Sequence, residues 1–475
     1  MTAAAGGRVS NFNLQTGTMD VGYGPGALPR AGVQYDLGGL APRIGLAYTL
    51  PRNTVIRSAF GIFHSAESNI FDDLGLNPPQ DTFNAAQYSA ASAPVTAQLI
   101  STGFPDTFPP YDPNNLAGSV KTTGSKRIMP KILEWNLTVQ HQFAQNWVFT
   151  AGYVGTHAYR LWNHESSDFN QALTPLDSNF NGPVPADCPS NNFGRPYFDQ
   201  QPCLVSILPL DYAQLHTSYN AFQTSLNKRF SGGFNMLVSY TFGQNLGNAD
   251  GNVGTYIQNS HDPNAEYGPA APDIRQRLSI SALYELPFGR GRHYMNDVNG
   301  VLDAFLGGWE LGTIITAQTG EALTAVLSAD TTNTGSFSPR ADQIHNPYDF
   351  SYNVAAQGNV FQCSNPGHQT LDCWYNQAAF AIPPLAPGQT FATTWGNSAI
   401  GNLRGPNLVN FDVVFQKNFK IHESQQIEFR AEFFNIFNHP NFGLPGANPD
   451  VPGGAAITST STDNRQIEFA LKYTF

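Results

Sequence analysis

Apolar and polar residues alternate along many segments of this chain, most clearly in the C-terminal segment 465–475, RQIEFALKYTF. Every second residue from Ile467 to Phe475 is large and apolar, and most of the residues between them are polar. Successive side chains of a β-strand point to opposite faces of its sheet, so this period of two predicts a strand with one apolar and one polar face. The same pattern recurs in further segments: 43–50, 54–63, 133–143, 147–156, 219–230, 234–242, 277–286, 309–318, 410–419 and 426–434. The alternation therefore predicts about eleven strands.

The connections between these strands differ in length in a regular way. Short turns lie at 51–53, 144–146, 231–233 and around 421–425, and long loops lie at roughly 64–132, 157–218, 243–276 and 319–409. A β-sandwich would show the same alternation within its strands. Short turns at one end of the strands and long loops at the other are typical of an outer-membrane barrel, with periplasmic turns and extracellular loops. We therefore predict an all-β fold, an antiparallel transmembrane β-barrel.

One connection, 287–308, is longer than the other turns. Its apolar residues recur at helical spacing: Val298, Val301, Leu302, Phe305 and Leu306. This spacing predicts a short helix against the rim of the barrel. We interpret it as a packed surface helix rather than a partner site.

The segment 1–42 precedes the first predicted strand. A complete bacterial barrel has an even number of strands and both ends in the periplasm. Counting back from a periplasmic C-terminus leaves residues 1–42 outside, either as an incomplete strand, for which NFNL within 8–16 is the candidate, or as a partial extracellular loop. The first residues have neither the basic n-region nor the apolar h-region of a signal peptide, which favours a chain that begins inside a loop.

Composition narrows the possible partners. The formal net charge is −11 and no cluster of Lys and Arg is present, so we expect no nucleic acid partner. No apolar run is long enough for a transmembrane helix. Only 12% of residues are charged and as many are aromatic, which disfavours a helical bundle and a charged disordered tail.

The four cysteines fall in two of the predicted loops: Cys188, Cys203, Cys363 and Cys373. Their even number and local spacing predict disulfides between Cys188 and Cys203 and between Cys363 and Cys373, in an oxidising compartment. Four cysteines allow three connectivities, and this pairing rests on proximity along the chain. His368 lies within the second pair, but no CxxC spacing accompanies it, so we predict no metal site.

Motifs of catalysis are not apparent. The histidines form no HExxH pair, no GxSxG elbow is present, and GYGPGALP at 22–29 lacks the Lys-Ser/Thr ending of a phosphate loop. Asp250 in NLGNADGNVGTY, 245–256, offers oxygen atoms to Ca²⁺, but the regular carboxylate spacing of a calcium loop is missing, which favours a solvated turn. We therefore expect no enzyme and no cofactor.

Two further sets of residues bear on ligand contact. The polar positions of the alternating strands would line a wet interior: Glu134, Asn136, Thr138, Gln140, Asn235, Asp412, Gln416, Glu428, Arg430 and Glu432. They would contact a plug or a hydrated solute, or satisfy one another. Aromatic residues of the loops would stack on ligands, form an interfacial girdle, or pack loop against loop: Tyr111, Trp162, Tyr197, Tyr348, Trp374 and Trp395.

Several motifs together resemble a known family. They are APRIGLAYTL, YGPAAPDIRQRLSISALYELPFGRGR, WYNQAAFAIPP, GNLRGPNLVNFDVVFQKNF and FRAEFFNIFNHPNFGLP. From about residue 40 to Phe475 the chain is similar to the C-terminal part of the β-barrel of TonB-dependent outer-membrane receptors of the Oar-like group. Residues 43–475 are thus expected to form that C-terminal part.

The resemblance implies a barrel of 22 strands, about half of which would be present here. It also implies uptake of a large solute such as a glycan, siderophore or peptide across a Gram-negative type outer membrane. The plug and the segment that contacts TonB are absent from this chain, so the TonB system would act only through missing N-terminal regions. Open alternatives are a secreted β-rich adhesin or carbohydrate-binding protein and a plug-free porin.

The resemblance gives the terminal strand a role. It implies that the strand is the signal read by the barrel-assembly machinery and that its apolar residues face outer-membrane lipid: Ile467, Phe469, Leu471, Tyr473 and Phe475.

Overall fold

The structure is a computed structural model. It describes residues 10–21, 34–35, 39–65, 74–78, 116–124, 126–163, 165–175, 188, 194–248, 257–336, 338–351, 363, 367–388, 390–422 and 425–475. No helix within these ranges is long and apolar enough to cross a membrane.

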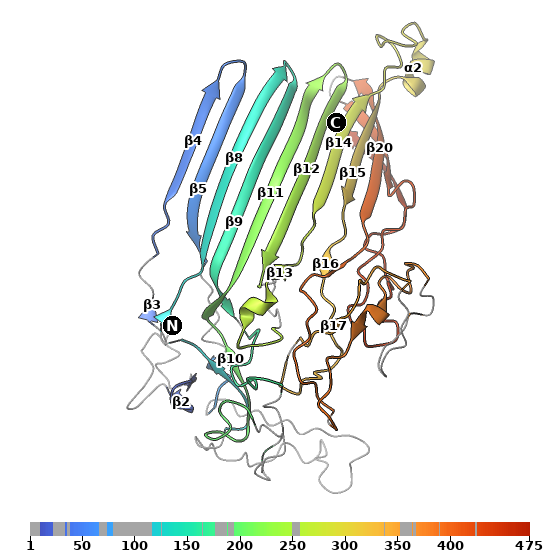
Figure 1. Ribbon diagram of the computed structural model, residues 1–475. Helices are drawn as coiled ribbons and strands as arrows, with labels where there is room; N and C mark the ends of the chain where they lie inside the picture. Colours follow the sequence, from blue (N-terminus) through green and yellow to red (C-terminus); the bar gives the residue numbers. More distant parts are fainter. Residues whose placement is uncertain are drawn as a thin grey trace, which may run out of the picture.

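The predicted strands form one large antiparallel sheet in which each long strand pairs with the next along the chain (Figure 1). They are β4 (Arg43–Leu50), β5 (Thr54–His64), β8 (Lys131–Ala144), β9 (Trp147–Asn163), β11 (Tyr212–Ser231), β12 (Phe234–Gly247), β14 (Gln276–Glu285), β15 (Trp309–Gln318), β20 (Leu408–His422), β21 (Gln425–Phe434) and β22 (Gln466–Thr474). The short β13 (Gly268–Pro269) pairs with the end of β12 and completes a 12-stranded sheet. Among the described residues the sheet ends at β4 and at β22, so it is curved but not closed. The prediction of about eleven strands in an antiparallel sheet is confirmed.

Turns and loops lie at opposite ends of the sheet, as predicted (Figure 1). At the turn end, β4 and β5 are joined through Arg52 and Asn53, and β11 and β12 through Gly232 and Gly233, all with positive φ. Positive φ at both central residues produces the hairpin turn whose twist matches that of paired strands. These two connections at the turn end are therefore tight hairpins. Successive hairpins are joined by the long loops at the opposite end of the sheet.

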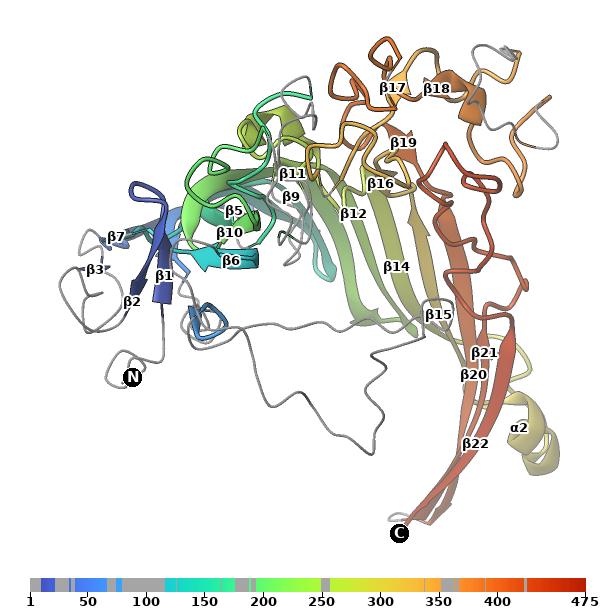
Figure 2. The same ribbon diagram turned by 90° about the horizontal axis from the view of Figure 1, so that it is seen from below.

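A short helix, α2 (Gly300–Leu306), lies in the connection from β14 to β15. Asn299 caps it, since its side chain accepts a hydrogen bond from the backbone N–H of Leu302 at 2.9 Å. The predicted helix is thus confirmed, although Val298 precedes it. The interpretation of it as a packed helix is wrong, because none of its residues is buried. Figure 2 shows α2 on the convex side of the curved sheet, beside β20 to β22.

The two faces of the sheet have different chemistry. Cross-strand pairs on one face include Leu137 with Tyr153 and Phe222 with Phe242, and the register carries this mainly apolar face from β4 to β22. Many of its side chains are exposed: Ile44, Leu46, Tyr48, Leu137, Phe149, Tyr153, Phe222, Phe242, Tyr284, Phe469 and Leu471. No second sheet covers this face within the described part of the chain. The other face carries the polar residues of the same strands.

The long loops and the N-terminal segment contain secondary structure of their own. They contain paired segments: β1 (Ser10–Asn13) with β2 (Thr18–Val21), β3 (Gln34–Tyr35) with β7 (Lys126–Arg127), β6 (Gly118–Thr122) with β10 (Leu204–Pro209), β16 (Ala322–Leu323) with β19 (Leu403–Arg404), and β17 (Asp342–Gln343) with β18 (Phe380–Ala381). Two 3₁₀ turns, η3 (Pro263–Glu266) and η4 (Gln377–Ala379), add to them. We call the described parts of the long loops, together with residues 10–21 and 34–35, the loop cap.

The buried apolar clusters lie in the loop cap rather than in the sheet. One cluster is built from Phe12, Met19, Leu116, Val120, Leu204 and Ile207. The other includes Leu327, Cys373, Tyr375, Phe380 and Leu403. The loop cap therefore has hydrophobic cores of its own, whereas the apolar face of the sheet points outward.

The NFNL segment of the N-terminal region is a strand, β1, but it is not part of the large sheet. It pairs with β2, and the Thr122 hydroxyl of β6 donates a hydrogen bond to the Phe12 carbonyl at 2.7 Å. The alternative of a further barrel strand at NFNL, which the sequence did not favour, is therefore excluded, because the backbone groups of β1 pair within the loop cap.

Candidate functional site

The polar face of the sheet carries all the residues that the alternation predicts for a wet interior. The register places them on the face opposite to the apolar one: Glu134, Asn136, Thr138, Gln140, Asn235, Asp412, Gln416, Glu428, Arg430 and Glu432. Arg430 lies 3.2 Å from a carboxylate oxygen of Glu428 and 3.2 Å from one of Glu432. The three side chains are partly exposed, so they satisfy one another and still present charge to water.

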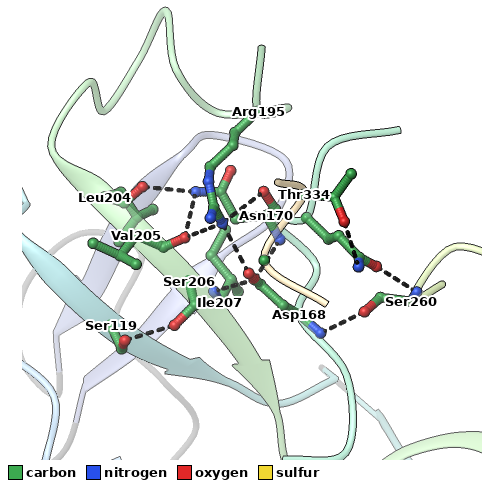
Figure 3. A network of polar contacts seen from close by, with 12 residues as sticks. Ser119, Asp168, Asn170, Arg195, Leu204, Val205, Ser206, Ile207, Ser260 and Thr334 are labelled. Atoms are coloured by element: carbon green, nitrogen blue, oxygen red, sulfur yellow. Dashed lines mark hydrogen bonds and ion pairs between the residues drawn. The ribbon is translucent and has the colours of Figure 1, made fainter. Parts of the chain in front are cut away.

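In the loop cap, Asp168 is the centre of a buried polar network (Figure 3). Its carboxylate accepts hydrogen bonds from the backbone N–H groups of Asn170 and Ile207, each at 2.8 Å, and from Arg195 at 3.0 Å. Only 2% of Asp168 is exposed. Burial raises the pKa of this carboxyl to about 6, while the charge of Arg195 and the backbone donors act in the opposite direction.

The network extends from Asp168 to other long loops. The backbone N–H of Asp168 donates to the Ser260 hydroxyl at 2.8 Å, and the backbone N–H of Ser260 donates to the Gln171 side chain at 2.6 Å. Gln171 in turn donates to the Thr334 hydroxyl at 3.3 Å. Three loops, namely those that follow β9, β12 and β15, are thereby joined by groups that are removed from water. Such a network fixes the relative positions of the loops because each broken bond would leave a buried polar group unpaired.

Two ion-pair groups strengthen the same connection. Arg340 lies 2.7 Å from Glu266, and both side chains are buried. Burial raises the pKa of Glu266 and lowers that of Arg340, and the opposite charge of the partner counteracts each shift. Asp273, which precedes β14, lies 2.6 Å from Arg404 and 3.0 Å from Arg275. The loop between β15 and β20 is therefore held to the loop between β12 and β14 at two places.

Both cysteine pairs lie in the loop cap. The structure joins Cys188 to Cys203 and Cys363 to Cys373, with Cα atoms 4.7 Å and 5.4 Å apart. Cys373 packs in the same cluster as the buried Tyr375. These bridges close the loops locally, which limits the conformations of the free chain.

Most of the loop aromatics that are described contact other loop segments. Tyr197 donates to the Leu14 carbonyl at 2.7 Å, and both Tyr348 and Trp374 donate to the Arg404 carbonyl, at 3.2 and 2.8 Å. Their polar atoms are thus used in packing loop against loop. Trp162 lies in β9 and not in a loop, because the strand extends to Asn163.

Other candidates are placed as follows. Tyr111, Asp250 and the segment GYGPGALP lie outside the described residues. His368 is exposed, and no group of three or more His, Cys, Asp and Glu in the described ranges is arranged to hold a metal. The residues that build the polar network, above all Asp168 and Arg195, were not predicted from the sequence. They lie in loop segments of mixed aromatic and polar residues, in which no periodicity marks them.

The terminal strand presents its predicted apolar residues outward: Ile467, Phe469, Leu471, Tyr473 and Phe475 are all exposed. The Phe469 ring stacks on Phe429 of β21 at a centroid distance of 6.3 Å.

Comparison with solved structures gives matches of low identity. The outer membrane transporter YddB from Escherichia coli is 10% identical, with 90% of this chain and 39% of that chain covered and a TM-score of 0.42. The ferric citrate transporter FecA in the unliganded form is 10% identical, with 97% and 40% covered and a TM-score of 0.40. The ferripyoverdine receptor of the outer membrane of Pseudomonas aeruginosa, bound to ferripyoverdine, is 8% identical, with 92% and 33% covered and a TM-score of 0.39. The chain thus spans between 33% and 40% of the length of these structures.

Among curated proteins no match was found. The sequence model of a family described as outer membrane beta barrel domain, in contrast, matches residues 2–468, nearly the whole chain. This family accounts for the up-and-down sheet, its exposed apolar face and its alternating polar face. The chain therefore belongs to the outer membrane beta barrel domain family and resides in the outer membrane of a Gram-negative type cell.

Proposed function

We propose that this chain is the barrel portion of a TonB-dependent receptor of the Oar-like group that takes up a large solute, such as a glycan, a siderophore or a peptide. In this proposal the loop cap captures the solute, and the solute then passes along the polar face of the sheet. The plug and the segment that contacts TonB would be supplied by regions outside this chain. No bond is made or broken, so the proposed protein is a transporter and not an enzyme.

The joined loop cap is the observation that carries the proposal. Binding is stronger when the binding surface is organised before the ligand arrives, because less conformational freedom is then lost. The Asp168 network and the Glu266–Arg340 ion pair hold three long loops together without using the exposed surface of the loop cap. Loops held together in this way are suited to the recognition of a large ligand outside the cell.

The polar face supports the second step of the proposal. Its charged and amide groups, such as Glu134, Gln140 and Arg430, are at least partly exposed to water, and the Arg57 guanidinium of the neighbouring strand donates to the Gln140 side chain at 2.7 Å. A hydrated solute would exchange its water for these groups at little cost, since polar contacts replace polar contacts. The alternative of a secreted, soluble adhesin conflicts with the apolar face, which no second sheet covers in the described chain.

We further propose that the terminal strand is read by the barrel-assembly machinery. Its outward apolar residues at every second position, up to Phe475, support this role together with the resemblance to outer-membrane barrels.

Uptake by whole cells tests the transport proposal. The gene would be deleted from its host, and accumulation of fluorescent glycans, iron–siderophore complexes and peptides would be compared with that of the parent and of a complemented strain. We expect accumulation of one class to fall and to recover on complementation. Unchanged accumulation of every class, with normal amounts of the protein in the outer membrane of the parent, would contradict the proposal.

A further inference from the structure

The connection between β14 and β15 differs from the other connections at the turn end because it contains α2. Four large apolar side chains of this helix are exposed to an unusual extent: Val301 by 69%, Leu302 by 46%, Phe305 by 72% and Leu306 by 40%. They are spaced i, i+1, i+4 and i+5, so they form one side of the helix. Such a side is not expected to remain in water.

The opposite side of α2 is occupied by contacts within the same connection. The Asp303 carboxylate accepts a hydrogen bond from the backbone N–H of Arg290 at 2.7 Å. The Arg290 side chain donates from Nε to the Val298 carbonyl at 2.8 Å. The polar side of the helix is therefore turned towards its own loop, and the apolar side is directed away from it.

The end of α2 is attached to the apolar face of the sheet. Lys417 of β20 lies on that face, opposite Trp309 of β15. Its ammonium donates hydrogen bonds to the carbonyls of Gly307 and Asp303. The indole N–H of Trp309 donates to the Phe305 carbonyl at 2.8 Å, and its ring stands edge to face against Phe429. These contacts set the orientation of the helix, and Figure 2 shows it on the convex side of the sheet.

The contact with α2 also provides hydrogen-bond partners for Lys417, which lies on the apolar face of the sheet. An ammonium group on a face that meets hydrocarbon is costly unless it is paired. Here the carbonyls at the C-terminal end of the helix accept its hydrogen bonds, and only 3% of the residue is exposed. The same contact therefore satisfies the lysine and positions the apolar side of α2.

Two observations identify the partner of this apolar side. The helix lies on the convex side of the sheet (Figure 2), and the exposed apolar face of the sheet meets lipid in a protein of the outer membrane. The helix also lies at the turn end, which in such barrels is periplasmic. Exposed Arg290, Arg292 and Tyr294 lie in the same connection. Arg292 pairs with Glu285 at 2.6 Å and Arg290 donates from Nε to Val298, and the remaining guanidinium N–H groups and the tyrosine are suited to the phospholipid interface. The chemistry that fits both is a phospholipid layer.

We propose that α2 is an interfacial anchor that inserts Val301, Leu302, Phe305 and Leu306 among the phospholipids of the periplasmic leaflet. The anchor holds the β14–β15 side of the sheet at a fixed depth, as amphipathic helices do when they lie in the plane of a membrane surface. The proposal rests on the outer-membrane location and is independent of solute uptake.

Depth-dependent quenching tests the anchor. The full-length chain with Phe305→Cys, its native disulfides intact, would carry an environment-sensitive fluorophore and be folded into vesicles of phosphatidylethanolamine and phosphatidylglycerol. The matched control is Ala304→Cys, because Ala304 is exposed on the same helix but lies on the side away from the four apolar residues. We expect lipids with a spin label near the headgroup to quench the probe at 305 and to leave the probe at 304 largely unaffected, while aqueous iodide does the reverse.

Two outcomes would overturn the proposal. One is equal iodide access at positions 304 and 305. The other is protection at 305 that disappears when the protein is diluted with lipid, since this would identify a second copy of the chain as the partner. Each labelled variant counts as folded if detergent does not fully unfold it until the sample is heated. Val301→Gln with the probe at 305 provides a second variant, for which we expect weaker quenching by lipid in folded protein.

Discussion

Arg340 and Glu266 form an ion pair between two long loops, with the Arg340 Nη1 atom 2.7 Å from the Glu266 Oε2 atom. Both side chains are almost fully removed from water. Glu266 also accepts a hydrogen bond from the backbone N–H of Gln258 at 3.1 Å, and Gln258 accepts one from the backbone N–H of Arg340 at 2.7 Å. The pair is thus part of a closed ring of contacts that keeps the two loops together.

Removal of one partner of this pair should loosen the loop cap. Arg340→Met leaves a buried carboxylate without its counter-charge, and we expect the free energy of loop opening to fall by about 3–5 kcal/mol. Hydrogen exchange of the amides around Gln258 and Arg340 measures this opening. The double variant Glu266→Gln with Arg340→Met should recover part of the loss, since no charge then remains buried. Equal exchange in the wild type and in Arg340→Met would contradict the role of this ion pair in holding the two loops together.

The Asp168 network should depend on pH in a defined direction. The pKa of the Asp168 carboxyl is about 6 in the folded protein, above its ordinary value of 3.8, so the folded state binds the proton more tightly. The contribution of this group to stability is therefore greatest at low pH, decreases as the pH rises from about 4 to about 6, and is constant above that range. The shift corresponds to roughly 3 kcal/mol.

Hydrogen exchange at the Asn170 and Ile207 amides, corrected for intrinsic rates, measures this pH dependence. Asp168→Asn is the matched variant, because its amide cannot titrate, and we expect the slope between pH 4 and 6 to vanish, whatever the overall change in stability. A slope that persists in Asp168→Asn would assign the titration to another group.

Gly155 of β9 is predicted to tolerate no side chain. A Cβ atom there would lie 2.2 Å from the Trp135 ring, which covers the glycine from the neighbouring strand. Gly155→Ala should displace this ring and lower the free energy of unfolding by about 1–3 kcal/mol. Gly45→Ala is the control, since the nearest atom to its Cβ would be the Ser58 carbonyl oxygen at 3.9 Å. Urea unfolding in vesicles, followed by tryptophan fluorescence, compares the two, and similar midpoints would contradict the prediction.

Phe475 should matter for assembly rather than for the stability of the assembled sheet. Phe475→Ser removes the exposed apolar residue that directly follows β22, and we expect a several-fold smaller amount of protein in the outer-membrane fraction. Lys472→Ser, on the polar face of the same strand, should assemble normally. Gel migration with and without heating distinguishes assembled from unassembled protein. Equal assembly of the two variants would contradict a role of Phe475 as a signal.

The strands were predicted well because the two faces of the sheet have different surroundings. In β12, every second residue from Phe234 to Phe242 is large and apolar, and the residues between them are polar except Leu237. This period predicts both the strand and the face that each residue occupies. Beyond the alternating part, β9 continues from 157 to Asn163, where His157, Ala158 and Tyr159 show no such period. Backbone hydrogen bonds to β11 extend the strand there, and backbone pairing leaves no mark in the sequence.

The loop cap could not be predicted in the same way. Asp168 and Arg195 are separated by 27 positions, and their meeting depends on the path of the loop between them. A buried polar network needs each partner in place, and isolated polar residues in a loop look the same whether they are buried or solvated. The cysteine pairs did give a local signal, because their spacing along the chain is short.

The distribution of apolar residues divides the molecule between two solvents. The clusters around Phe12 and Tyr375 are shielded from water by the loop cap itself, whereas the apolar face of the sheet has no cover from the described chain and relies on lipid. Detergent concentration should therefore govern the integrity of the sheet, and urea or reduction of disulfides should govern that of the loop cap. The loops can in consequence change their surface during evolution under the folding rules of a water-soluble protein, while the strands that carry them remain under the rules of the membrane.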